Sequence, residues 1–359
     1  MLMVIFGAGA SYDALADAQP PQRHLADSVK NLQCRPPLAN ELFERRAFFD
    51  PWIEQYRECA PVVDRLRRLP QESNLERELE KLRAEAADYP QRHVQLHAIR
   101  YYLRRTISRC GEGVITESKG VTNYATLLDH VGYWRAKHPS EEVRFVTFNY
   151  DTLLEHACET ALKLPFPSII SYVSRIYRVY KPHGSVNWVR HIENGDIVDH
   201  GNPEHSIIGL GDRLKLRDDL YQVWHPEAAA VQEEGRYVYP AIALPVEAKS
   251  DFECPSDHLN YLKSDIPNVT RLLIIGWRAT EAHFLELWRQ HPRVALISKI
   301  AIVAGDSGEA QRVQNNLTAV GIGVRPALSP AGPDTTFLLS DHGFSEFLTA
   351  RELDEFLAD

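Results

Sequence analysis

The sequence lacks the cysteine pairs from which a disulfide framework or a zinc ribbon is built. Its 359 residues include five cysteines, an odd number, and they are scattered without C-x-x-C spacing at Cys34, Cys59, Cys110, Cys158 and Cys254. Neither a disulfide-rich secreted scaffold nor a cysteine-bound metal is therefore expected. The pattern indicates a protein of a reducing compartment that holds no metal.

Long apolar runs and an excess of positive charge are also missing. No apolar stretch approaches the roughly 18 residues that span a bilayer, and the N-terminus has the pattern of a core strand instead of a signal peptide. We therefore expect a cytoplasmic protein without a membrane contact. The formal net charge of -9 argues against bulk nucleic-acid binding, and we expect no sequence-specific contact with nucleic acid.

The chain begins instead with a strand and a glycine-rich turn. Residues 1–6 are apolar, and Gly7-Ala8-Gly9-Ala10-Ser11 follows at once. In α/β proteins such a turn brings backbone N–H groups close to a pyrophosphate. The third glycine of the dehydrogenase pattern is absent because Tyr12 stands there, and no second strand with an acidic end follows. The turn therefore predicts a nucleotide-binding site that is not of the dehydrogenase type. The alternative is a glycine-rich turn that binds no ligand.

The chain changes character between residues 40 and 138, where apolar residues repeat at helical spacing. Strand-like runs return after residue 140 and alternate with helical segments. We predict an α/β fold, a Rossmann-like mainly parallel sheet with a large helical insertion or cap. Its core would span residues 1–20 and 140–359, with the insertion at 40–138, as a single domain of residues 1–359. The expected strands are residues 1–6, 143–148, 176–181, 238–244, 272–275 and 300–304.

Two further polar stretches directly follow expected strands. They are Thr147-Phe148-Asn149-Tyr150-Asp151 and Lys181-Pro182-His183-Gly184-Ser185. Open parallel sheets bind ligands at the carboxyl ends of their strands, so both stretches fit one shared pocket with the first turn. Each stretch also has a structural interpretation, because asparagine and histidine–glycine pairs are frequent in turns.

Together these motifs resemble the signatures of the sirtuin superfamily: the G-A-G-x-S turn, the T-x-N-x-D motif and the H-G pair. Ile274-Ile275-Gly276-Trp277 resembles the turn that closes over ribose and phosphate in that family. The likeness extends over the whole chain and is strongest for the bacterial SIR2-like branch of antiphage defence. Two more stretches, residues 74–76 and 343–347, also resemble that branch.

The resemblance implies an NAD+ glycohydrolase that yields nicotinamide and ADP-ribose, with NAD+ as substrate. Asn149 would orient the attacking water and contact the ribose, and His183 would act as general base or bind the ribose hydroxyls. Asp151 would meet the nicotinamide carboxamide, although it also stands where a cap of the helix starting at Leu153 is expected. The glycine turn would cradle the pyrophosphate. The implied binding residues are Gly7, Ala8, Gly9, Ser11, Asp151, Gly276, Gly305 and Asp306, the last two near the adenosine.

The chain departs from sirtuin deacylases, which carry a four-cysteine zinc module next to their acyl-lysine groove. The helical region replaces that module, which favours hydrolysis of NAD+. A protein deacylase or ADP-ribosyltransferase and a non-catalytic NAD- or ADP-ribose-binding scaffold are the alternatives. An effector that depletes NAD+ must be held inactive, so we expect a regulatory protein, for example an ATPase or an Argonaute-type protein, or a homo-oligomer, contacting the helical region.

Overall fold

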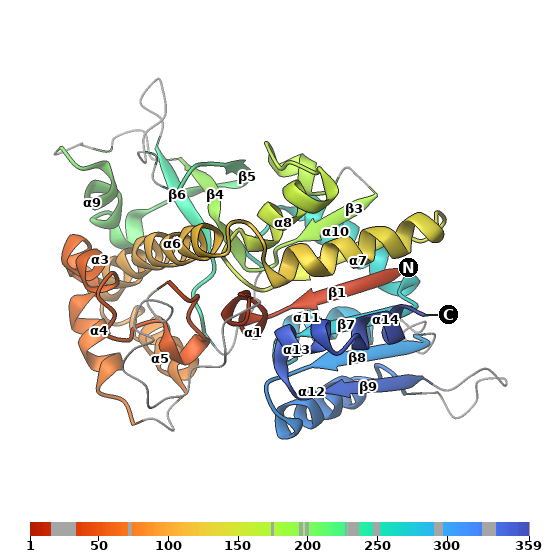
Figure 1. The fold of residues 1–359 in the computed structure, drawn as a ribbon. Coiled ribbons are helices and arrows are strands. Elements are labelled where there is room, and N and C mark those ends of the chain that lie inside the picture. The colour runs from red at the N-terminus through yellow and green to blue at the C-terminus, as the bar shows by residue number, and fades with distance from the viewer. Residues whose placement is uncertain are drawn as a thin grey trace.

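A six-stranded parallel sheet, in the order β3-β2-β1-β7-β8-β9, forms the core of one half of the molecule in the computed structural model (Figure 1). The structure describes residues 1–15, 34–70, 74–173, 176–193, 197, 201–226, 228, 237–246, 252–290, 297–324 and 335–358. The strands of this sheet are β1 (Leu2–Phe6), β2 (Val143–Thr147), β3 (Tyr177–Tyr180), β7 (Arg271–Ile275), β8 (Lys299–Val303) and β9 (Thr336–Ser340). The predicted α/β class with a mainly parallel sheet is confirmed.

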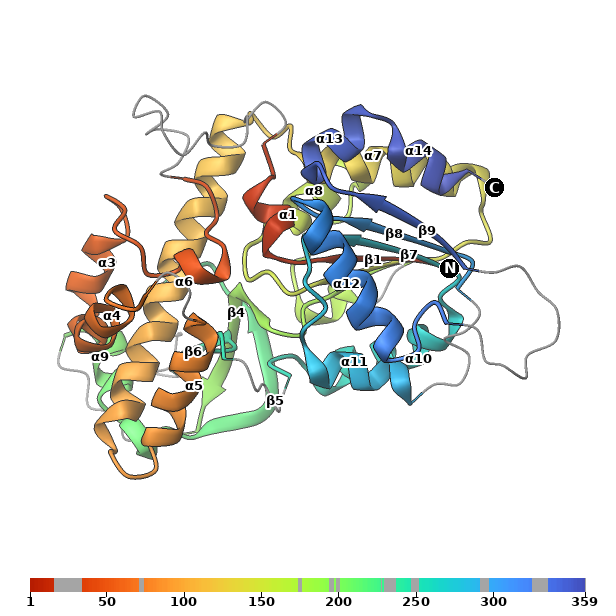
Figure 2. The ribbon, with the colours of Figure 1, turned by 90° about the horizontal axis from the view of Figure 1, so that it is seen from below.

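Burial on both faces explains why the central strands are continuous apolar runs. All five residues of β1 and of β2 are buried, as parallel sheets covered on both sides require. Helices α7, α13 and α14 cover one face, and α10, α11 and α12 cover the other (Figure 2). These helices are α7 (Asn123–Lys137), α10 (Ser256–Asp265), α11 (Ala282–Arg289), α12 (Ser307–Ala319), α13 (Gly343–Thr349) and α14 (Glu352–Leu357).

A second hydrophobic cluster lies beside the first, and a smaller antiparallel sheet, ordered β5-β4-β6, contributes residues to both. Its strands are β4 (Gly184–Ile192), β5 (Leu216–Val223) and β6 (Val238–Ile242). The strand expected at residues 238–244 therefore belongs to this sheet and not to the parallel one. The surrounding helices are α3 (Asp50–Gln55), α4 (Ala60–Arg67), α5 (Leu75–Glu85), α6 (Gln91–Glu117) and α9 (Pro203–Ile208).

The long helix α6 links the two parts of the molecule. Its buried residues from Leu96 to Cys110 lie in the second cluster, and Val114, near its end, lies in the first. Helix α7 also falls within the expected insertion of residues 40–138, yet Leu127, Leu128 and Val131 pack in the first cluster against the parallel sheet. The part of the insertion that packs apart from the parallel sheet therefore ends before α7.

Candidate active site

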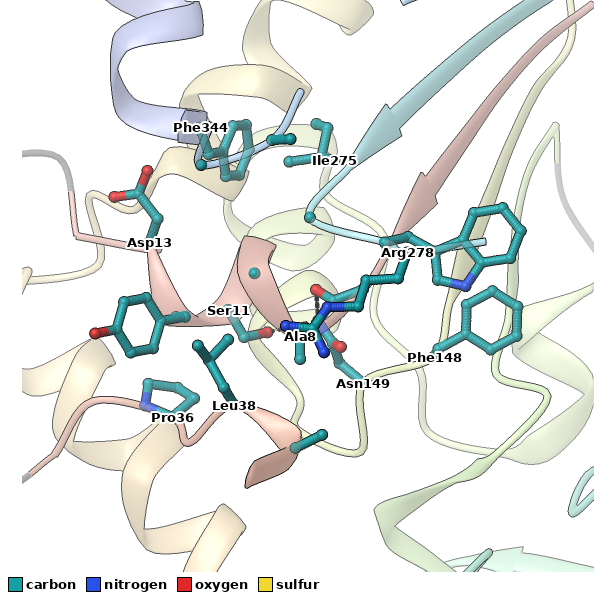
Figure 3. Close-up of a pocket in the computed structure, with 18 of the residues that line it drawn as sticks. Ala8, Ser11, Asp13, Pro36, Leu38, Phe148, Asn149, Ile275, Arg278 and Phe344 are labelled. Carbon is teal, nitrogen blue, oxygen red and sulfur yellow. Dashed lines mark hydrogen bonds between the residues drawn. The ribbon is translucent and has the colours of Figure 1, made fainter. Parts of the chain in front are cut away.

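A cavity of about 650 Å³ opens at the carboxyl ends of β1, β2, β7 and β8. Residues 35–42, which we call the strap, form part of the opposite wall together with Glu76 of α5 and Ile107 of α6. The cavity thus lies where the parallel sheet meets the second cluster. Figure 3 shows the short helix α1 (Ala8–Tyr12) crossing it, with Pro36 and Leu38 of the strap facing Ser11. This is the edge of the sheet at which ligands were expected.

Two glycine turns interlock at the floor of the cavity. A Cβ on Gly7 would come within 2.5 Å of the Gly276 oxygen, and one on Gly9 within 2.8 Å of the Gly276 Cα. Gly276 has a φ of +59°, and a Cβ there would meet the Ala10 nitrogen at 2.4 Å. The Gly7 N–H donates to the oxygen of Ile275 at 3.0 Å and the Gly9 N–H to that of Gly276 at 3.1 Å. These glycines are required by backbone packing, and both N–H groups already have acceptors.

Asn149 is held by the glycine turn through its side-chain amide. Its Nδ2 donates to the Gly7 oxygen and to the Ser11 Oγ, both at 2.8 Å, and lies 3.2 Å from the Tyr124 hydroxyl. A carbonyl oxygen only accepts hydrogen bonds, so Gly7 requires the amide nitrogen on its side and leaves Oδ1 turned away from the turn. Asn149 is buried and lines the cavity (Figure 3).

Tyr124, on α7, is a site residue that sequence reasoning missed. Its hydroxyl lies 2.9 Å from the Ser11 Oγ as well as near Asn149. Burial, with a further contribution from the Asp151 charge, raises the pKa of Tyr124 well above its usual range, so the phenol stays neutral. Tyr124 lies within residues 40–138, where apolar residues repeat at helical spacing, and that pattern does not indicate where its hydroxyl points.

His183 stands on the tight turn between β3 and β4 and lines the same cavity. Its ring centroid is 4.9 Å from that of Phe148, which in turn stacks on Trp277 at 5.1 Å. On another side the ring of His283 lies 6.0 Å away at an interplanar angle of 23°. The imidazole is therefore set in an aromatic wall contributed by loops after β2 and β7 and by α11.

Asp151 and Lys181 join the loops that carry Asn149 and His183. Asp151 Oδ1 accepts from the Leu153 N–H at 3.0 Å, which is the capping contact expected as the alternative, and Asp151 also lines the cavity. Lys181 is fully buried; its Nζ donates to the Asp151 carbonyl and lies 2.8 Å from Glu155 Oε1 on α8 (Leu153–Leu162). This ion pair fixes one loop against the other.

Nine of the ten predicted site residues line the cavity, and Asp306 is the exception. Gly305 lies in the cavity wall after β8. Asp306 lies outside the residues that line the cavity, and its Oδ1 instead accepts from the Glu309 N–H at 2.7 Å at the start of α12. Arg278 and Glu281 also line the cavity, although the sequence patterns did not single them out.

Arg278 is the more exposed of the two arginines in the cavity wall. Its side chain is 64% exposed and its Nε donates to Glu309 Oε1 at 3.2 Å. Figure 3 shows the side chain extending towards the glycine turn.

Within the described ranges, no group of three or more His, Cys, Asp or Glu side chains is placed to hold a metal ion. The helices of those ranges include none with the length and apolarity needed to cross a membrane.

Comparisons with known proteins give structural neighbours only. No protein-family model matches the chain, and no curated protein matches it. A mutant Sir2 homologue in complex with 2′-O-acetyl ADP ribose is 13% identical with a TM-score of 0.42, and the match covers 100% of this chain and 93% of that one. A Sir2 homologue–NAD complex is 12% identical with a TM-score of 0.38, covering 99% and 90%. A Sir2 bound to acetylated peptide is 12% identical with a TM-score of 0.37, covering 100% and 94%. The fold class rests on the strand order itself.

Proposed function

We propose that this chain binds NAD+ and hydrolyses its N-glycosidic bond, yielding nicotinamide and ADP-ribose. The observation that carries the proposal is the Asn149 amide, bound to Gly7 and Ser11 of the glycine turn in a cavity that His183 also lines. Three motifs separated by more than 30 residues each along the sequence thus meet at one place. A cavity of about 650 Å³ falls within the usual size range of ligand sites.

The chemistry needs a held ribose and a placed water. In the proposed reaction the C1′–N bond breaks, its electron pair stays on the nicotinamide, and positive charge develops at C1′. Water then attacks C1′ and its proton passes to the His183 imidazole. Asn149 presents Oδ1 as an acceptor for that water or for a ribose hydroxyl, because its Nδ2 is committed to the glycine turn. We assign general-base action to His183 and positioning of the water to Asn149.

We assign the remaining contacts with NAD+ to other residues of the cavity wall. Asp151 has one carboxylate oxygen on the Leu153 N–H, so Oδ2 is the atom that we assign to the nicotinamide carboxamide. We place the pyrophosphate beside Ala8 and Arg278, since the N–H groups of Gly7 and Gly9 are already bonded. Gly276 and Gly305 would border the two riboses.

The biological role that we attach to this activity is that of an antiphage defence effector. Hydrolysis of NAD+ is harmful to the cell that carries it out, so the enzyme would be switched on by a regulatory protein or by self-assembly. We assign the contact to the outer faces of α3, α4 and α5. A purified monomer that hydrolyses NAD+ at full rate alone would contradict this regulatory part of the proposal.

The test is nicotinamide release from NAD+ by the wild type, Asn149→Ala and His183→Ala, each alone and with candidate regulatory proteins. Asn268→Ala and His130→Ala are matched controls, because both side chains lie on the surface away from the cavity. Loss of release in the first pair but not the second supports the hydrolase. Formation of O-acyl-ADP-ribose from an acyl-peptide would indicate a deacylase instead. NAD+ binding without release under any condition would indicate a scaffold.

A further inference from the structure

Arg35, at the start of the strap, is a buried arginine whose Nε has no acceptor among the residues that the structure describes. The residue is only 5% exposed and lines the cavity, yet its Nε is buried and donates to no residue that the structure describes. Among the same residues no carboxylate lies within ion-pair distance of it. A guanidinium is always charged, and burying it without a partner is costly. An unpaired buried donor of this kind calls for a ligand or another explanation.

The neighbouring Asp13 is not the partner of this guanidinium. Its Oδ2 accepts from the Ser345 N–H at 2.9 Å and its Oδ1 from the Ser345 Oγ at 2.7 Å. Burial raises the pKa of Asp13, and the Arg35 charge offsets this only as a minor cause. Both carboxylate oxygens of Asp13 thus accept hydrogen bonds from Ser345, near the start of α13. Asp13 therefore does not neutralise Arg35, which lines the cavity without a carboxylate partner among the described residues.

The guanidinium is held in place before any ligand binds. Its central carbon lies 4.7 Å from the centroid of the Tyr12 ring, so the aromatic ring packs against one face of the guanidinium. The Arg35 carbonyl accepts from Arg46 Nη1 at 2.7 Å, and Arg46 pairs with Glu41 at 3.0 Å. The prolines at 36 and 37 further restrict the strap. A preorganised arginine loses little side-chain entropy on binding.

We propose that Arg35 binds a phosphate group of a ligand in this cavity. A planar guanidinium that has no carboxylate partner among the described residues matches the paired oxygens of a phosphate. Arg278, the other cavity arginine, differs from Arg35 because its side chain is 64% exposed and paired with Glu309; it adds positive charge beside the pyrophosphate but is not a buried, unpaired guanidinium. The phosphate has two possible sources, the pyrophosphate of a nucleotide or a separate inorganic phosphate. Only the nucleotide source rests on the proposed function.

The test compares ligands with and without phosphate by isothermal titration calorimetry. ADP, adenosine and inorganic pyrophosphate are titrated into the full-length wild type, Arg35→Gln and Arg35→Lys. Arg289→Gln is the matched control, because it removes a surface arginine from α11 that lies outside the cavity. We expect Arg35→Gln to lower the affinity for ADP at least about tenfold and to leave the affinity for adenosine unchanged. Arg35→Lys should retain part of the affinity for ADP.

The outcomes separate this proposal from the proposed function. Selective loss of ADP affinity supports a nucleotide phosphate, and selective loss of pyrophosphate affinity alone supports a separate phosphate; neither measurement depends on nicotinamide release. An equal ADP-to-adenosine affinity ratio in the wild type and Arg35→Gln, with pyrophosphate also unchanged, overturns the proposal. Failure of the folded wild type to bind ADP and pyrophosphate overturns it too. Circular dichroism checks folding, and Arg35→Lys serves if the glutamine variant does not fold.

Discussion

The buried ion pair between Lys181 and Glu155 tests how the two site loops are held together. Lys181→Met keeps the aliphatic stem but removes the ammonium group, which lies 2.8 Å from Glu155 Oε1. The Glu155 carboxylate would then stay buried with the Tyr172 hydroxyl on Oε1, while Oε2 already has no partner among the described residues. Removing one partner of a buried ion pair destabilises a protein by about 3–5 kcal/mol, because the other charge stays buried without compensation. We expect the free energy of unfolding of Lys181→Met to fall by this amount.

Urea unfolding followed by circular dichroism measures this loss as a lower midpoint at an unchanged slope. Lys181→Met combined with Glu155→Gln should recover roughly half of the loss, because no uncompensated charge remains. Lys81→Met is the matched control: its partner is Glu78 on the surface of α5, and such pairs contribute up to about 1 kcal/mol. A loss below about 1 kcal/mol for Lys181→Met, or no recovery in the double variant, would refute the reasoning.

Three further predictions concern Gly9, Tyr124 and His97. Gly9→Ala should lower the free energy of unfolding by about 1–3 kcal/mol, because the added Cβ would lie 2.8 Å from the Gly276 backbone. Gly305→Ala is the control and should lower the free energy of unfolding less, because its Cβ would lie 3.8 Å from the nearest atom. Equal urea midpoints for the two variants would contradict this. Tyr124→Phe should slow nicotinamide release about tenfold and cost about 1 kcal/mol of stability; unchanged release would remove Tyr124 from the site. Burial lowers the pKa of His97 to about 4 from 6.5, so the unfolded state takes up more protons as pH falls between these values and stability declines. His97→Gln should flatten that decline in urea midpoints, and parallel pH profiles would contradict it.

The four inner strands of the parallel sheet were predictable because burial on both faces leaves a simple sequence pattern. β1, β2, β7 and β8 are buried along nearly their whole length, so each is a short continuous apolar run followed by a turn. β5 was missed because its outer position leaves Arg217, Asp218 and Asp219 exposed, which removes the apolar signal. β9 was missed because an edge strand with Leu339 exposed is only half-buried.

Some residues of the candidate site could be expected from the sequence, whereas Tyr124, Arg278 and the bonding of the site could not. Asn149 and His183 follow predicted strands, so their place at one edge of the sheet could be expected. The sequence did not indicate that Gly7 and Gly9 pack on Gly276 and use their N–H groups there. It also left open whether Asp151 caps a helix, and the structure shows that contact.

By itself, the sequence determined the α/β class and the position of polar motifs after strands, because hydrophobic periodicity and glycine turns act over a few neighbouring residues. The tertiary structure decided which distant groups meet: Asn149 with Ser11, Lys181 with Glu155, and Arg35 with the Tyr12 ring instead of a carboxylate. Such contacts depend on how the two clusters pack and on which donors find acceptors once buried. No local pattern in the chain specifies these partners, since they join residues from separate elements.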